Sequence, residues 1–155
     1  MDNFRKLENK FFKEIELHIK KAYPKINGNL VPSTYKEDTE FSFDAKINDK
    51  QFSIRIRKHK YLKYPDLTIR AKSKNNGKTE IDKIRDGLAQ VYFYAYMNKK
   101  ENYLVKIRMV DVVSIRKLTQ KNKYKRRKNS DGTEFNTYLF SDIKKENGDL
   151  YKYDK

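Results

Sequence analysis

Two short tracts of the chain interleave cations with aromatic rings. Lys58 leads into His59-Lys60-Tyr61-Leu62-Lys63-Tyr64, and a second tract runs Lys123-Tyr124-Lys125-Arg126-Arg127-Lys128. Such interleaving can bind a single nucleic-acid strand, because cations neutralise phosphates while tyrosine rings stack on unpaired bases. The ordinary alternative for the second tract is a flexible basic loop that adds only non-specific affinity.

More cations fall on one side of strands that alternate polar and apolar residues. This predicted face carries Asp44, Arg55, Arg57, Thr68, Arg70 and Lys72. A sheet face with so little counter-charge suits a phosphate backbone, because each neutralised phosphate releases condensed counterions. The alternative is an ordinary solvated face, partly neutralised by Glu40, Asp44 and Asp66.

Other kinds of site chemistry are missing from the sequence. The chain has no cysteine and only two histidines, which excludes disulfides and thiol chemistry and leaves no histidine-rich zinc site. His18 falls on the apolar side of a predicted helix and is expected to be buried. We find no Gly-rich phosphate loop and no Ser-His-Asp arrangement, and we expect neither a metal site nor a small-molecule cofactor.

The overall charge limits the classes of partner. The 155 residues include 37 Lys and Arg against 21 Asp and Glu, a formal charge of +16. A field of this size attracts polyanions, so we expect DNA, RNA or an acidic protein surface as partner. The alternative is that the lysines reflect an AT-rich genome and keep the chain soluble. No apolar run approaches the ~18 residues of a membrane span, and we expect a cytoplasmic protein.

The elements that must position these side chains follow from periodicity. We predict a helix over 4–22, a loop over 25–39, a hairpin of strands 40–47 and 52–57, a third strand over 67–72, a helix over 79–96, a strand over 103–109 and a last strand over 133–140. The predicted class is α+β in one domain: a helix, a three-strand antiparallel meander, a helix and further strands, with the helices packed on one face of a mixed sheet. Residues 1–115 form the core, 116–132 a basic loop, and 133–155 the C-terminal strand and a polar tail.

Several motifs fit this order. Asp44 lies in the hairpin, and the third strand reads Ile69-Arg70-Ala71-Lys72-Ser73. The second helix carries Gln90-Val91-Tyr92-Phe93-Tyr94, a Q-x-x-x-Y pattern, and Glu8 lies in the first helix. Over about residues 4 to 115 the arrangement resembles the PD-(D/E)XK nuclease-like superfamily, and the Q-x-x-x-Y helix is similar to that of its RecB-like and lambda-exonuclease-like branches.

The resemblance implies a magnesium site formed by Glu8, Asp44 and Asp66, with Lys72 as the lysine that supports catalysis. It also places Gln90 and Tyr94 beside the cleft, although Tyr94 in the core and Gln90 on a helix surface is the structural alternative. Arg70 stands where the family's strand has an acid, and Asp44-Ala45-Lys46 is a D-x-K on the wrong strand. A divalent cation among Arg55, Arg57, Arg70 and Lys72 would be repelled. We therefore expect standard metal-dependent catalysis to be lost or rebuilt.

Three functions stay open at this point. The first is a nucleic-acid-binding protein on a nuclease-like scaffold. The second is an anti-defence inhibitor, because small Lys-rich chains look like phage or mobile-element products of low-GC bacteria. Some of those proteins, such as anti-CRISPRs, dock on a host nuclease such as a Cas effector, and a basic face complements an acidic cleft. The third is an active Mg-dependent nuclease.

Overall fold

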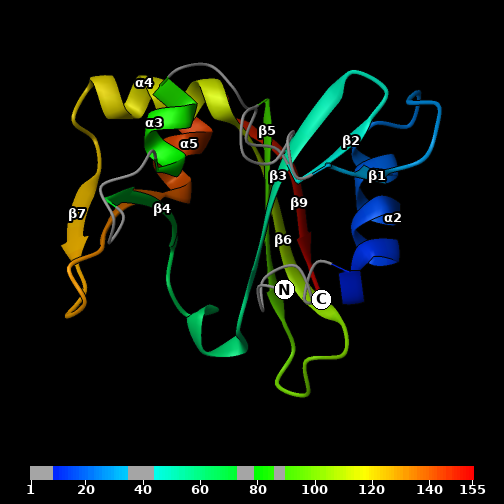
Figure 1. Cartoon of the computed structure of the whole chain (residues 1–155), viewed down its shortest axis with the longest axis horizontal. Coiled ribbons are helices and arrows are strands. Elements are labelled where there is room, and N and C mark those ends of the chain that lie inside the picture. Colours follow the sequence, from blue (N-terminus) through cyan, green and yellow to red (C-terminus); the bar gives the residue numbers. More distant parts are fainter. Residues whose placement is uncertain (1–8, 35–43, 73–78, 86–89) are drawn as a thin grey trace.

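The computed structural model describes residues 9–34, 44–72, 79–85 and 90–155. Two β-sheets form its frame (Figure 1). The larger has the order β1 (Val31–Pro32), β2 (Ala45–Ile47), β3 (Lys50–Arg57), β5 (Val91–Met97), β6 (Leu104–Asp111) and β9 (Asp149–Asp154). The smaller has the order β4 (Asp66–Lys72), β8 (Glu134–Leu139) and β7 (Lys125–Lys128). The predicted α+β class with a mixed sheet is confirmed.

The first helix and the hairpin follow their predicted periodicity. Helix α2 (Phe12–Ala22) buries Ile15, His18 and Ile19, as the apolar stripe predicts. Strands β2 and β3 pair antiparallel around a turn in which Asn48 has a φ of 51°, a conformation that asparagine tolerates. The predicted start of the helix, with Glu8, and the first residues of the hairpin, up to residue 43, lie outside the described residues.

The predicted helix over 79–96 is wrong in its second half. Helix α3 is described over Glu80–Arg85, the predicted helical residues 86–89 lie outside the described residues, and residues 91–97 form β5, a central strand of the larger sheet. Every residue of β5 is buried, because both of its faces are covered. A strand that is apolar at every position has no alternation, so its sequence also fits a buried helix. Gln90 therefore directly precedes a strand, and Tyr94 lies within it.

The predicted three-strand meander is also wrong at its third strand. Strand β3 pairs in parallel with β5, while β4 leaves the larger sheet and pairs antiparallel with β8. The short 3-10 helix η2 (His59–Tyr61) lies in the connection that carries the chain from one sheet to the other. As a result, Thr68, Arg70 and Lys72 do not lie on strands adjacent to Arg55 and Arg57 in one sheet.

The C-terminal part contains more regular structure than its polar sequence suggests. The predicted basic loop over 116–132 contains the end of helix α4 (Val112–Gln120) and strand β7. The predicted boundary at residue 115 thus falls inside a helix. The predicted strand over 133–140 is confirmed as β8, but the expected polar tail forms helix α5 (Phe140–Lys145) and strand β9, which pairs with β6.

Two apolar layers cover the two faces of the larger sheet. Helix α2 packs through Phe11, Ile15 and Ile19 on one face. Helices α3, α4 and α5 lie together on the other face with the smaller sheet (Figure 1). This second layer brings the cation-rich strands β4 and β7 close to the end of β3, which is where the candidate site forms.

Candidate nucleic-acid interface

Strand β7 divides the second basic tract between two sides. All four of its residues are exposed. Arg126 and Lys128 lie within 3.6 Å of Glu134, and Arg126 also donates from Nε to the side-chain oxygen of Asn136 at 2.6 Å. Lys125 and Arg127 point to the opposite side because side chains alternate along a strand. Of the four residues of β7, Lys125 and Arg127 therefore add positive charge to the smaller sheet's other surface.

That surface, the small-sheet face, is set by the pairing register. Residues opposite one another in antiparallel strands share a face. Thr68 and Lys125 both lie opposite Thr137, and Arg70 and Arg127 both lie opposite Phe135. We define the small-sheet face as Asp66, Thr68, Arg70, Lys125, Arg127, Phe135 and Thr137. Its described charges are three cations and one carboxylate.

A pocket of about 260 Å³ opens between this face and the end of β3. Its lining joins the two basic and aromatic tracts, which are far apart in the sequence. It consists of Arg57, Tyr61, Tyr64, Asp66, Thr68, Arg127, Asn129, Phe135 and Thr137. We call it the arginine–tyrosine pocket. The pocket has arginine side chains on two walls, which can bind a phosphate, and three aromatic rings, which can stack on a base.

Arg57 is the most unusual group of this pocket. Its guanidinium carbon lies 3.9 Å from the centroid of the Tyr61 ring, a close cation–π contact. Its Nε is buried and finds no hydrogen-bond partner within the described part of the chain. A buried donor without an acceptor costs about 1–3 kcal/mol. An anionic oxygen in the pocket would remove that cost.

Asp66 is the acid of the pocket. Burial raises the pKa of the Asp66 carboxyl above its ordinary value, although Arg127, Arg57 and Lys125 act in the opposite direction. Ionised Asp66 reduces the pocket's positive charge, since Arg57 and Arg127 alone would carry two. The remaining net charge matches one singly charged phosphodiester better than a doubly charged terminal phosphate.

Phe135 forms an aromatic wall held between two arginines. The guanidinium carbons of Arg55 and Arg70 lie 5.9 Å and 5.8 Å from its ring centroid. These contacts bring Arg55 and Arg70 toward one ring although they belong to different sheets. Phe135 and Thr137 on β8 and Asn129, directly after β7, are site residues that sequence reasoning missed.

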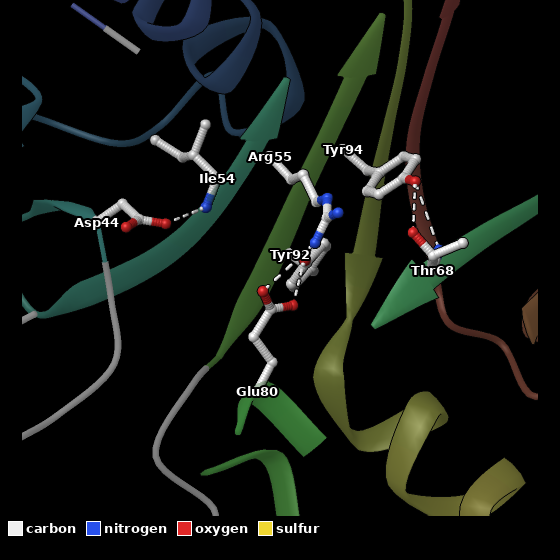
Figure 2. A network of polar contacts seen from close by, with 7 residues as sticks. All are labelled: Asp44, Ile54, Arg55, Thr68, Glu80, Tyr92 and Tyr94. Atoms are coloured by element: carbon white, nitrogen blue, oxygen red, sulfur yellow. Dashed lines mark hydrogen bonds and ion pairs between the residues drawn. The ribbon is translucent and has the colours of Figure 1, made fainter. Parts of the chain in front are cut away.

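Arg55 itself is committed to a buried network rather than to solvent (Figure 2). Its side chain is 14% exposed, and its guanidinium lies 3.4 Å from Glu80 of α3. Tyr92 donates its hydroxyl to the other Glu80 oxygen at 2.9 Å. Burial alone would lower the pKa of Arg55, but Glu80, Tyr92 and Tyr94 raise it above its ordinary value. Arg55 therefore stays charged and structural.

The remaining cations of the first tract lie close in sequence to the pocket residues Tyr61 and Tyr64. Lys58 and Lys60 are exposed and His59 is half-buried, next to or within η2. The Lys60 and Lys63 ammonium groups lie 5.1 Å and 5.3 Å from the rings of Tyr61 and Tyr64. In the second tract, Lys123 is exposed, and Tyr124 packs against Tyr138 at a ring distance of 5.8 Å. Part of the Tyr124 ring is therefore covered by Tyr138 and is not accessible to a base.

Gln90 and Tyr94 do not meet at a cleft. The Gln90 side-chain oxygen accepts a hydrogen bond from the Gln51 backbone at 3.2 Å. Tyr94 is buried, and its hydroxyl lies 3.3 Å from the Thr68 hydroxyl, which joins β5 to β4 (Figure 2). Tyr94 is therefore a core residue, as the structural alternative expected, whereas Gln90 precedes strand β5 and does not lie on a helix.

The residues proposed for a magnesium site are spread over the molecule. Asp44 accepts a hydrogen bond from the Ile54 backbone at 2.6 Å in the larger sheet (Figure 2). Asp66 begins β4 among arginines, Lys72 ends β4 on the surface, and Glu8 is outside the described residues. Across 9–34, 44–72, 79–85 and 90–155, no group of three or more His, Asp or Glu residues could hold a metal ion. These described carboxylates do not fit the magnesium site that the resemblance implies.

Comparisons with known proteins give little more. No protein-family model matches the chain, and no curated protein matches its sequence. Among solved structures, a nuclease from a fusselovirus is similar with a TM-score of 0.40 and 18% identity, over 86% of this chain and 79% of that one. A TM-score of this size does not establish a shared fold, so the site is interpreted from its own residues. In the described part of the chain no helix is both long and apolar enough to span a membrane.

Proposed function

We propose that this protein binds nucleic acid through the small-sheet face and the arginine–tyrosine pocket, without the standard metal-dependent chemistry of nucleases. One observation carries the proposal: cations and rings from residues 57–64 and from 127–135 line a single pocket. In nucleic-acid sites, arginines commonly bind the phosphates and aromatic rings stack on the bases. The formal charge of +16 adds long-range attraction for any polyanion.

The direct test reverses charge on the small-sheet face. In the Lys125→Glu/Arg127→Glu variant we expect the affinity for labelled single-stranded DNA or RNA to fall about tenfold or more, because two phosphate contacts are lost. Both side chains are exposed, so the variant should fold normally. Binding is measured by fluorescence anisotropy with EDTA present and then with Mg²⁺ and Mn²⁺, and the strands are checked for cleavage.

The matched control is Lys13→Glu/Lys21→Glu, which changes the net charge equally on helix α2, across the larger sheet from the pocket. We expect it to retain most of the affinity. Equal losses in both variants would contradict a localised site. No binding by the wild-type protein would contradict the proposal altogether, and a search for a protein target would follow.

A further inference from the structure

We propose that the arginine–tyrosine pocket holds one unpaired nucleotide of a single strand, with its phosphodiester between Arg57 and Arg127 and its base against Tyr64. This inference rests on the proposed nucleic-acid binding and adds the class of ligand. It predicts that the protein discriminates single strands from duplexes through the pocket, while the surrounding cations attract both.

The size of the pocket limits the occupant. Its volume is about 260 Å³, slightly below the ~300 Å³ at which pockets for drug-sized ligands begin. A space of that size admits one nucleotide unit and excludes a base pair. In a duplex the bases are stacked and paired, so only an unpaired nucleotide can place its base inside.

The phosphate position follows from the two arginines. Arg57 is held against Tyr61, and its buried Nε finds no acceptor within the described residues. Arg127 reaches the same pocket from β7. Asp66 lines the same pocket, and its ionised carboxylate brings the net charge of these three groups to +1. That charge suits a phosphodiester within a strand, which carries a single negative charge.

The base position follows from the exposed ring. Tyr64 is 41% exposed, and its ring centroid lies 6.4 Å from that of Tyr61. Tyr61 is already covered on one side by Arg57, so it acts as a positioning residue for that guanidinium. Tyr64 therefore offers the more accessible surface for a base, and Phe135 lines the pocket with a third ring.

The test separates stacking from charge. Tyr64→Ala is compared with Tyr64→Phe and with Tyr103→Ala, which removes a similarly exposed ring (38%) next to β6. The probes are oligothymidylate and oligouridylate of about twelve nucleotides, a length within the usual site sizes of single-strand binders. A duplex and an abasic strand of equal length complete the set. We expect Tyr64→Ala to weaken single-strand binding about tenfold and to leave duplex and abasic binding unchanged.

The controls fix the interpretation. Tyr64→Phe and Tyr103→Ala should behave like the wild-type protein, since the first keeps the ring and the second lies elsewhere. Equal wild-type affinity for single strand, duplex and abasic strand, with no effect of Tyr64→Ala, would overturn the nucleotide pocket but leave the proposed function standing. If polyglutamate displaced the labelled single strand as effectively as oligothymidylate does, the nucleotide pocket would also be overturned, because binding would then depend on charge alone. If the wild-type protein bound none of these nucleic acids, both proposals would be overturned.

Discussion

At the scale of single residues, Arg55 connects elements that are separate in the sequence. It alternates with apolar residues on β3 as a solvent-facing cation would, yet its side chain is mostly buried against Glu80 and near Phe135. Glu80 also accepts the hydroxyl hydrogen bond of Tyr92, whose pKa is raised well above its ordinary value by burial and then by Glu80. The network ties α3 to both β3 and β5.

We predict that Glu80→Ala lowers the free energy of unfolding by about 2–3 kcal/mol, because Arg55 and Tyr92 lose their common partner in a desolvated place. The measurement is urea denaturation followed by far-UV circular dichroism. Arg85→Ala is the matched control in the same helix, since its pair with Asp82 is an exposed one and should be worth no more than about 0.5 kcal/mol. Equal losses in the two variants would contradict a structural role for the Arg55 network.

At the scale of elements, the contact between α4, α5 and β9 depends on Gly148. Its N–H donates to the Ile143 carbonyl at 2.9 Å, and its carbonyl accepts from the Asp111 N–H at 2.8 Å. A Cβ at this position would lie 2.0 Å from the Ser114 hydroxyl oxygen and 2.3 Å from the Ser114 Cβ. Glycine is therefore required by close packing of these elements.

We predict that Gly148→Ala lowers the free energy of unfolding by about 1–3 kcal/mol, the usual cost of overpacking. Gly132→Ala provides the comparison: it meets nothing within 4 Å but has a φ of +88°, so its cost should be about 1 kcal/mol from backbone strain alone. Thermal and urea denaturation measure both. A Gly148→Ala protein as stable as the wild type would show that α4 can move away from β9 at no cost.

At the scale of the whole molecule, the proposed binding combines two contributions, the formal charge of +16 and the local site. The overall field would attract any polyanion, whereas the small-sheet face and Arg57 are the proposed positions at which phosphates are neutralised. The dependence of affinity on salt distinguishes the two, because its slope counts the phosphates that are contacted.

We predict a slope of about −2 for the logarithm of single-strand affinity against the logarithm of salt concentration, from three phosphates at about −0.7 each: one shared by Arg57 and Arg127, one at Arg70 and one at Lys125. Lys125→Gln/Arg127→Gln should reduce its magnitude by about 0.7, because Arg57 still contacts the phosphate that Arg127 shares, while Lys13→Gln/Lys21→Gln leaves it nearly unchanged. A slope that responds equally to both variants would place the contacts across the whole charged surface.

Local periodicity correctly predicted the elements that have one buried face. The stripe of α2, the alternation along β3 and the turn at Asn48 are properties of short segments, and the structure confirms them, together with the strands predicted over 103–109 and 133–140. Strand β5 was not predicted as a strand because both of its faces are buried, which removes the period of two. Strand β7 and helix α5 were not predicted because polar sequences reveal little about packing.

The candidate site depends on pairings between distant segments. The basic character and the tyrosine-rich tracts are visible in the residues, but their meeting in one pocket requires β4 to leave the larger sheet and to pair with β8, and β7 to pair with β8 in turn. Such pairings are chosen by the burial of side chains from the whole chain, such as Leu67, Ile69 and Tyr138 in the second core. The same burial directed Arg55 inward and left Arg57 and Arg127 at the pocket.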